Sequence, residues 1–215
     1  MKKTTLTVPA GSARVEAFVA EARVSGRVTA ELRIVEAGEV KVAENGDGDE
    51  AELASVPWNP LSFASARAAV IEAETALDGS IDELVVFADP PRDAVGIAES
   101  TPKAIERAAL EWAAGYAELV REACRRFDEK GGGALVLVVV TSERGPLGAM
   151  AAGALLGLAE GMMAVGTGSV RFAAIRDESD QPDLLARQIV KTLGEPARDQ
   201  GRILRFGGRS GFFGR

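Results

Sequence analysis

The residues that could carry chemistry gather in a short polar loop, Thr141–Gly145, which follows an unbroken apolar run at Ala134–Val140. The loop holds Ser142, Glu143 and Arg144, a hydroxyl between an apolar strand and two charged groups. The chain has no histidine, which removes the commonest general base at neutral pH and the commonest metal ligand. A serine or cysteine nucleophile paired with histidine is therefore excluded.

The sequence also predicts neither a metal site nor a disulfide. Cys124 is the only cysteine, so zinc sites built from Cys and His are excluded, as is a disulfide within the chain. A lone cysteine in a helical pattern is typical of a buried small hydrophobe, and it fits a reducing cytoplasm. The acidic stretch Asn45–Glu50 lacks the ligand spacing and the downstream glutamate of a calcium loop, so no metal site is predicted.

Composition and charge fit one globular domain. The chain has 215 residues, 47% of them apolar, and 25 basic against 32 acidic side chains give a net charge of −7. That balance argues against nucleic acid as the main partner. The N-terminus MKKTTLTVPAGS has no apolar core of a signal peptide, so we expect a cytoplasmic protein. Residues 145–170 are nearly uncharged, but Glu160 within them favours an interface-forming helix over a membrane span.

Apolar patterns predict strands that alternate with helices along the chain. Strands are expected at Thr4–Val8, Arg27–Val35, Glu39–Ala43, Glu52–Val56, Leu84–Ala88, Ala134–Val140, Val170–Ile175 and Arg202–Phe206. Helices are expected at Ala13–Ser25, Phe63–Leu77, Thr101 to about Lys130, Leu147–Val165 and Leu184–Leu193. Prolines 57 and 60 are expected to end the fourth strand. This alternation predicts an α/β fold of the Rossmann-like, doubly wound type, with a mostly parallel sheet and helices on both faces.

The order and spacing of several segments resemble a short-chain dehydrogenase/reductase over nearly the whole chain. The matching segments are IDELVVFAD (Ile81–Asp89), the long helix before GGGALVLVVVTS, ALLGLAEGMMA, VRFAAI (Val170–Ile175) and GRILRFGG (Gly201–Gly208). They resemble the family's IDxLVNNAG, GGxIVNISS, KAALLGLxxxLA, RVNAVxPG and GxxLxVDGG. The resemblance implies a single domain over 1–215, with a C-terminal tail at 207–215.

The segment that would bind the cofactor departs from the family pattern. Val8–Ala20 aligns without gaps to the family's TGxxxGxG turn, but Pro9 and Ala10 replace its Thr-Gly, and Arg14 and Glu16 replace later glycines. Those glycines let the backbone approach the pyrophosphate. We therefore expect no bound cofactor, although Arg14 could still pair with a phosphate.

The catalytic residues of the family are also missing. Its YxxxK pair would fall at Gly148 and Ala152, which can neither supply a proton nor lower a pKa. Its helix asparagine would fall near Trp112, and Ser142 alone follows the pattern. After the strand Val170–Ile175, the family's usual Pro-Gly is Arg176-Asp177, and the next helix starts soon after, which implies a reduced substrate lobe. No catalytic residue is predicted.

The surfaces that family members use to form oligomers are better kept. The resemblance implies pairing through the fourth and fifth long helices, and a second contact at the last strand and tail. Gly153, Gly157 and Gly161, with Ala149, line one face of the helix expected at Leu147–Val165 and allow another backbone to come close. In the preceding helix Trp112, Tyr116 and Leu119 share a face, which either forms an interface or covers the chain's own sheet. Phe212 and Phe213 in the tail are expected to dock on a partner or to be disordered.

Three functions remain open from the sequence. The first is a non-catalytic subunit that pairs with a catalytic short-chain dehydrogenase/reductase, stabilising it or completing its site. The second is a homo-oligomeric binding or regulatory protein that uses the nucleotide cleft for another ligand, with Arg14 and Ser142 lining it. The third is a divergent NAD(P)-dependent oxidoreductase that uses Glu143 or Arg144 beside Ser142.

Overall fold

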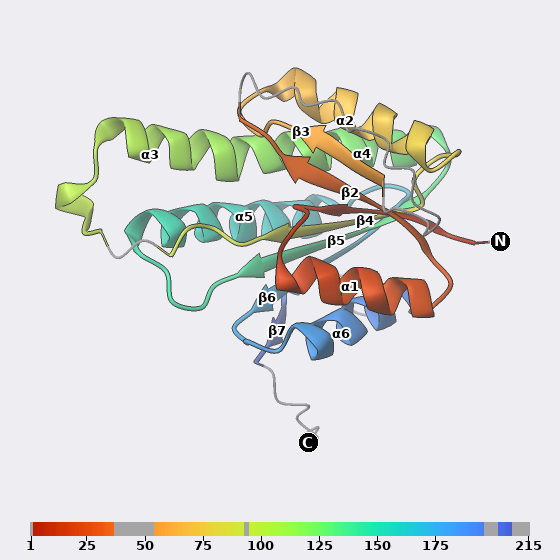
Figure 1. Ribbon diagram of the computed structural model, residues 1–215. Helices are drawn as coiled ribbons and strands as arrows, with labels where there is room; N and C mark the ends of the chain where they lie inside the picture. Colours follow the sequence, from red (N-terminus) through yellow and green to blue (C-terminus); the bar gives the residue numbers. More distant parts are fainter. Residues whose placement is uncertain (1, 37–53, 93–94, 196–201, 208–215) are drawn as a thin grey trace, which may run out of the picture.

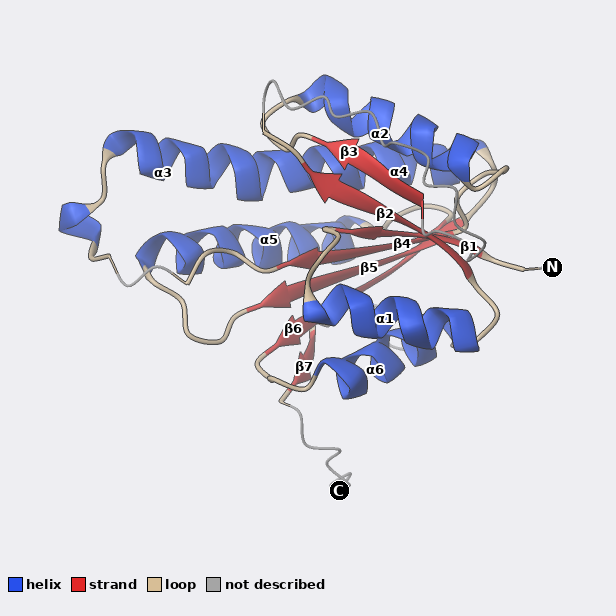
Figure 2. Cartoon of the chain, viewed as in Figure 1, coloured by secondary structure: helices blue, strands red, loops and turns tan. Residues whose placement is uncertain are grey.

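The apolar runs of the sequence form the strands of one parallel sheet. The computed structural model describes residues 2–36, 54–92, 95–195 and 202–207. Its strands make a seven-stranded sheet in the order β3-β2-β1-β4-β5-β6-β7, and each neighbouring pair is parallel. Figures 1 and 2 show the sheet between two layers of helices. This confirms the expected doubly wound α/β fold.

The elements follow the expected order closely. They are β1 (Thr4–Val8), α1 (Ala13–Val24), β2 (Val28–Ile34), β3 (Ala54–Trp58), α2 (Phe63–Ala76), β4 (Glu83–Ala88), η1 (Ile97–Glu99), α3 (Pro102–Ala108), η2 (Ala109–Gly115), α4 (Tyr116–Glu129), β5 (Gly133–Val140), α5 (Pro146–Val165), β6 (Val170–Asp177), α6 (Pro182–Gly194) and β7 (Leu204–Phe206). The strand expected at Glu39–Ala43 and the acidic stretch Asn45–Glu50 lie outside the described residues.

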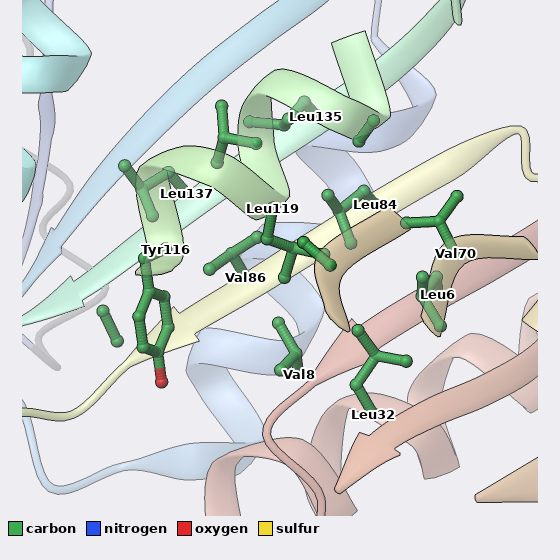
Figure 3. Packing of buried hydrophobic residues seen from close by; sticks show 14 of the residues in the cluster. Leu6, Val8, Leu32, Val70, Leu84, Val86, Tyr116, Leu119, Leu135 and Leu137 are labelled. Atoms are coloured by element: carbon green, nitrogen blue, oxygen red, sulfur yellow. The ribbon is translucent and has the colours of Figure 1, made fainter. Parts of the chain in front are cut away.

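Two hydrophobic cores hold the layers together. On one face α2, α4 and α5 pack on the sheet, and on the other face α1 and α6 do so. The central strands β4 and β5 are buried along almost their whole length, as expected for strands that helices cover on both sides. Figure 3 shows the first core, where Leu119 of α4 lies against Leu84 and Val86 of β4.

Two boundaries differ from expectation for clear physical reasons. We expected Pro57 to end the fourth strand, but β3 continues through it to Trp58. A proline cannot donate a backbone hydrogen bond, and β3 tolerates it because it ends the described strand order and has a partner on one side only. Strand β6 extends to Asp177, two residues beyond the expected Ile175, which places the Asp177 side chain at the carboxyl edge of the sheet. Only residues 178–181 then connect β6 to α6.

The long helix before β5 is continuous but not uniform. It begins at Thr101, whose hydroxyl caps the helix by accepting from the Ala104 N–H, and runs as α3, η2 and α4. The middle section, η2, is a π-helix, a rare geometry that often marks functional sites. Gly115 at its end allows a close approach to the loop after β3, because a Cβ there would lie 2.3 Å from the Pro60 carbonyl oxygen.

Helix α5 presents an unusual surface. Among the described residues it is the one helix long and apolar enough to cross a membrane by length and composition, yet one side of it packs on the sheet of this chain. Its large side chains Leu147 and Leu155 are buried, but the small residues Ala149, Gly153, Gly157 and Gly161 are exposed. An α5 helix that packs against another subunit accounts for the same composition.

Candidate functional site

A crevice site is expected where the strand order reverses. The chain leaves β1 toward β2 on one side and continues at β4 on the other, so the switch point lies between the carboxyl ends of β1 and β4. In folds of this kind ligands bind there, and the N-terminus of the first helix faces the ligand phosphates. Helix α1 starts at this point, after a turn in which Gly11 has a positive φ of 82° and Ser12 caps the helix.

Ion pairs lie at the start of α1, on the side of the crevice where phosphates bind in folds of this kind. The Arg14 Nε lies 2.7 Å from Oδ2 of Asp177, and its Nη2 donates to the Ser179 carbonyl oxygen at 2.7 Å. Asp177 is fully buried, and its other oxygen accepts from the Ser179 N–H and hydroxyl. The Arg14 guanidinium thus neutralises a carboxylate of its own chain, and it is occupied where a phosphate would need it.

A second arginine extends this network to the end of β4. Arg144 donates to one carboxylate oxygen of Asp89 and to the Pro90 carbonyl oxygen, and its side chain is 3% exposed. The other Asp89 oxygen lies 3.6 Å from Nη1 of Arg14. The four side chains of this ion-pair network therefore link α1, the end of β4, the loop after β5 and the end of β6, which together surround the crevice. They are Arg14, Asp89, Arg144 and Asp177.

The loop after β5 does not assemble catalytic groups around its serine. The Ser142 hydroxyl is buried and has no hydrogen-bond partner among the described residues. Arg144 is turned to Asp89, and the Glu143 side chain is 82% exposed, with Arg92 as its nearest cation at 3.8 Å. Among the described residues, neither Glu143 nor Arg144 forms a hydrogen bond with the Ser142 hydroxyl.

The position of the family's catalytic tyrosine is closed by the backbone. A Cβ atom at Gly148 would lie 2.2 Å from the Pro91 carbonyl oxygen and 3.3 Å from the Arg144 side chain. Side-chain carbons do not approach backbone oxygens this closely, so even alanine forces the loop to move. Ala152, at the position of the family's lysine, is 3% exposed and packs in the first core. A lysine there would place its charge next to apolar side chains.

The only tyrosine of the chain lies in the first core. Tyr116 is fully buried, and its ring meets Trp58 edge-on at 5.1 Å and stacks with Trp112 at 5.3 Å between centroids. Its hydroxyl has no partner among the described residues, and neither has the Trp58 indole nitrogen. Burial, with smaller contributions from the charges of Glu111 and Asp89, raises the pKa of Tyr116 far above its usual value. Figure 3 shows its hydroxyl directed away from Leu119.

We expect Tyr116→Phe to leave the free energy of unfolding unchanged or to raise it by up to about 1 kcal/mol, because it removes a buried hydroxyl that has no partner. Urea denaturation measures this. Tyr116→Ala is the control and should lower the free energy by about 3–5 kcal/mol, since it empties a core position. A loss above about 1 kcal/mol in Tyr116→Phe would instead show that a water or ligand binds the hydroxyl.

A cavity of about 330 Å³ remains over the other half of the carboxyl edge. Its wall combines residues after β2 and β3 with one side of the long helix: Ile34, Val35, Glu36, Asn59, Pro60, Leu61, Lys103, Glu106, Arg107, Leu110 and Glu111. Arg107 lies 2.9 Å from both Glu36 and Glu111 and joins the strand end to the helix. Arg14 and Ser142, the residues expected to line a binding cleft, do not line this cavity.

The predicted interface residues of η2 and α4 divide into two groups. Tyr116 and Leu119 are fully buried in the chain's own core, so they cannot contact a partner. The expectation that they form an interface is therefore corrected, because this face of the helix covers its own sheet. Trp112 is half-buried beside Tyr116 and keeps some surface. Helical periodicity alone could not separate the two outcomes, because both require an apolar stripe.

The predicted residues of α5 do reach the surface. The stripe of Ala149, Gly153, Gly157 and Gly161 is exposed, and a Cβ at any of the three glycines would meet nothing within 4 Å. No described part of the chain therefore makes the close approach that the stripe permits, and its role as an interface stays a prediction. Phe212 and Phe213 lie outside the described residues. Among the described residues no group of Asp, Glu and Cys is arranged to hold a metal ion.

The strand order and the crevice define the class of the fold, which is the doubly wound type that binds dinucleotides. No family model matches the sequence, and no curated protein matches it.

Solved structures with the same fold identify its type more closely. A short-chain dehydrogenase/reductase from Serratia marcescens superposes with a TM-score of 0.76 at 19% identity, covering 96% of each chain. An oxidoreductase of the same family from Brucella ovis, in complex with a partially ordered NAD, gives 0.77 at 14% identity over 96% of this chain and 100% of that one. A gluconate 5-dehydrogenase from Burkholderia cenocepacia, in complex with NADP and tartrate, gives 0.74 at 15% identity over 97% and 95%. This chain has the short-chain dehydrogenase/reductase fold.

Proposed function

We propose that this chain is a non-catalytic member of the short-chain dehydrogenase/reductase family and serves as a structural subunit beside a catalytic relative. The observation that carries the proposal is the closed position at Gly148. The Pro91 carbonyl occupies the space of a side chain there, so the chain lacks both the tyrosine and the room for it. A proton donor at that place is what the family's chemistry requires.

The side chains at the crevice support the same proposal, because they disfavour binding of a dinucleotide cofactor. A dinucleotide brings two phosphate charges to the start of α1, where this chain already pairs Arg14 with the buried carboxylate of Asp177. A phosphate would have to displace that carboxylate, which would then remain buried without its cation. Such an exchange is unfavourable, because an unpaired buried charge costs several kcal/mol.

The exposed face of α5 supports a role in an oligomer. Small side chains make up much of this face, which is exposed within the described chain. Glycines on one stripe let two helices approach closely, as Ala149, Gly153, Gly157 and Gly161 would here. The partner is a catalytic short-chain dehydrogenase/reductase in the cytoplasm, and a second copy of this chain can occupy the same face in its absence.

Titration with NADH and NADPH, followed by fluorescence and thermal unfolding, tests the non-catalytic assignment. A ligand at one hundred times its Kd stabilises a protein by about 2.7 kcal/mol, which a melting curve detects. We expect no shift with either cofactor. A clear shift with NADH or NADPH would contradict the proposal and favour a divergent oxidoreductase.

Gly157→Leu is expected to abolish the oligomer, because the leucine side chain holds the helices apart. The same variant should keep the fold, since a Cβ at Gly157 meets nothing within 4 Å. Analytical ultracentrifugation measures the self-association, and co-purification measures pairing with a relative that has an intact YxxxK. Gly194→Leu is the matched control: it is also an exposed helical glycine with open space around it, but it lies on α6. Equal association of both variants would show that the α5 stripe is not the interface.

The cavity over β2 and β3 favours a second candidate, a binding protein that uses this half of the crevice for a ligand without a pyrophosphate. Its volume of about 330 Å³ lies at the lower end of small-molecule sites. Adenosine is a suitable probe. A thermal shift with adenosine, none with NADH, and loss of the shift in Leu110→Trp would favour this candidate.

A further inference from the structure

One carboxyl group is buried in the middle of β2 without a cation. The Glu31 side chain belongs to a residue that is 9% exposed, and β2 lies between β1 and β3. Among the described residues its carboxyl group forms no hydrogen bond and no ion pair. The other buried carboxylates of the described chain, Glu83, Glu122 and Asp177, all have arginine partners. Glu31 is therefore the exception among them.

The neighbours of Glu31 on the sheet are two threonines. Thr7 of β1 is its register partner, and Thr29 precedes it by two residues on β2, so all three side chains leave the same face of the sheet. Both threonines are buried, and neither hydroxyl has a hydrogen-bond partner among the described residues. A hydroxyl can accept a hydrogen bond from a neutral carboxyl group or donate one to a carboxylate, but it supplies no positive charge.

The charges that face Glu31 come from α1, which packs against β2. Glu16 in the first turn of α1 brings a second negative charge, and Arg23 in its last turn has a smaller, opposite effect. Arg33 follows on the same face of β2 but forms no ion pair with Glu31. The register partners of Glu31 in β1 and β3 are uncharged. The surroundings therefore favour the neutral carboxyl group.

Ionisation of Glu31 costs stability in the folded chain. A buried carboxylate without a cation is unfavourable, whereas the neutral group is tolerated more easily. Burial first, and then the charge of Glu16, raises the pKa of Glu31 above its ordinary value. In the unfolded chain the pKa returns to that ordinary value. The folded state therefore has the full benefit of the neutral group below the ordinary pKa, and it loses this benefit as the pH rises through the raised pKa.

We propose that Glu31 makes the contact between α1 and β2 sensitive to pH: the helix packs firmly on the strand while the carboxyl group is neutral, and less firmly once it is ionised. Helix α1 also carries Arg14 of the ion-pair network, so the change acts on an element that borders the crevice. Glu31 lies outside that network and on a different strand from Asp89 and Asp177. The proposal does not depend on the subunit role.

Urea unfolding of the full chain and of Glu31→Gln over a range of pH tests this proposal. Glutamine has the shape of the neutral glutamate and carries no charge at any pH. The two chains should have similar unfolding constants near about pH 4.5, and at about pH 8 the constant of the unchanged chain should be about tenfold larger. Glu72→Gln, at an exposed carboxyl group on α2, is the control and should give a ratio that does not change with pH. An equally constant ratio for Glu31→Gln would overturn the proposal.

Amide hydrogen exchange locates the effect. At about pH 7, Glu31→Gln should slow exchange in α1 and β2 relative to the unchanged chain, because these elements then open less often. The change in β5 should be smaller, since β1 and β4 separate that strand from β2. A change of equal size in β5 and in α1 would show that Glu31 acts on the whole fold, and it would overturn the local role proposed for the contact between α1 and β2.

Discussion

Arg14→Met is expected to lower the free energy of unfolding by about 3–5 kcal/mol at pH 7, since it leaves a buried carboxylate without its cation. Asp177 is fully buried, and the methionine keeps the apolar part of the Arg14 side chain while removing its charge. The Ser179 N–H and hydroxyl still bond to one Asp177 oxygen, so we expect the loss near the lower end of that range. Urea denaturation followed by circular dichroism measures it.

The double variant Arg14→Met/Asp177→Asn separates the charge from the packing. With the carboxylate neutralised, most of the lost stability should return, because no buried charge remains unpaired. Arg187→Met is the matched control, since that arginine is 65% exposed and lies 4.0 Å from Glu21. It should cost less than about 1 kcal/mol. A loss of the same size in Arg14→Met and Arg187→Met would contradict the role assigned to the ion-pair network.

Gly148→Ala should destabilise the protein by about 1–3 kcal/mol, because its Cβ would overlap the Pro91 carbonyl oxygen at 2.2 Å. Gly153→Ala, on the same helix, is the matched control. A Cβ there meets nothing within 4 Å, so the substitution should raise the stability of the isolated chain by up to about 1 kcal/mol. Thermal and urea unfolding should show lower stability for Gly148→Ala and higher stability for Gly153→Ala than for the unchanged chain. Stabilisation by both would show that the loop at Pro91 yields easily.

The same geometry predicts the outcome of an attempt to install the family's catalytic pair. Gly148→Tyr/Ala152→Lys should give a destabilised protein with no reductase activity, because the tyrosine cannot enter without moving Pro91 and the lysine enters the apolar core. Assays with NADPH and a panel of carbonyl substrates check this. Activity in this double variant would mean that the loss of two side chains is the only barrier to catalysis.

The fold could be predicted from sequence because its signals are local. The apolar run at Ala134–Val140 and the capped helix from Thr101 each carry their own pattern within a few residues. The strand at Glu52–Val56 was predicted, but not its continuation through Pro57, because the tolerance for proline depends on β3 lying at the end of the described strand order.

For the site, the sequence predicts only which residues differ from the family pattern. The sequence shows that Arg14 replaces a glycine, but its partner Asp177 lies 163 residues away and is brought near by the sheet. It shows that Gly148 is not tyrosine, but not that Pro91 fills the space. Tyr116 is equally compatible with a core and an interface by spacing alone. These are contacts between distant segments, for which one sequence carries no local signal.

We expect the ion-pair network to couple the two halves of the sheet during unfolding, in addition to the backbone pairing of β1 with β4. In a doubly wound fold the crevice separates two βαβ units, and a dinucleotide bound across it joins them. Here Arg14 of the first unit is joined to Asp89 and Asp177 of the second by contacts that need no ligand. Amide hydrogen exchange in β1 and β6 should therefore report one cooperative opening, with a free energy that is the same at every nucleotide concentration in the cell.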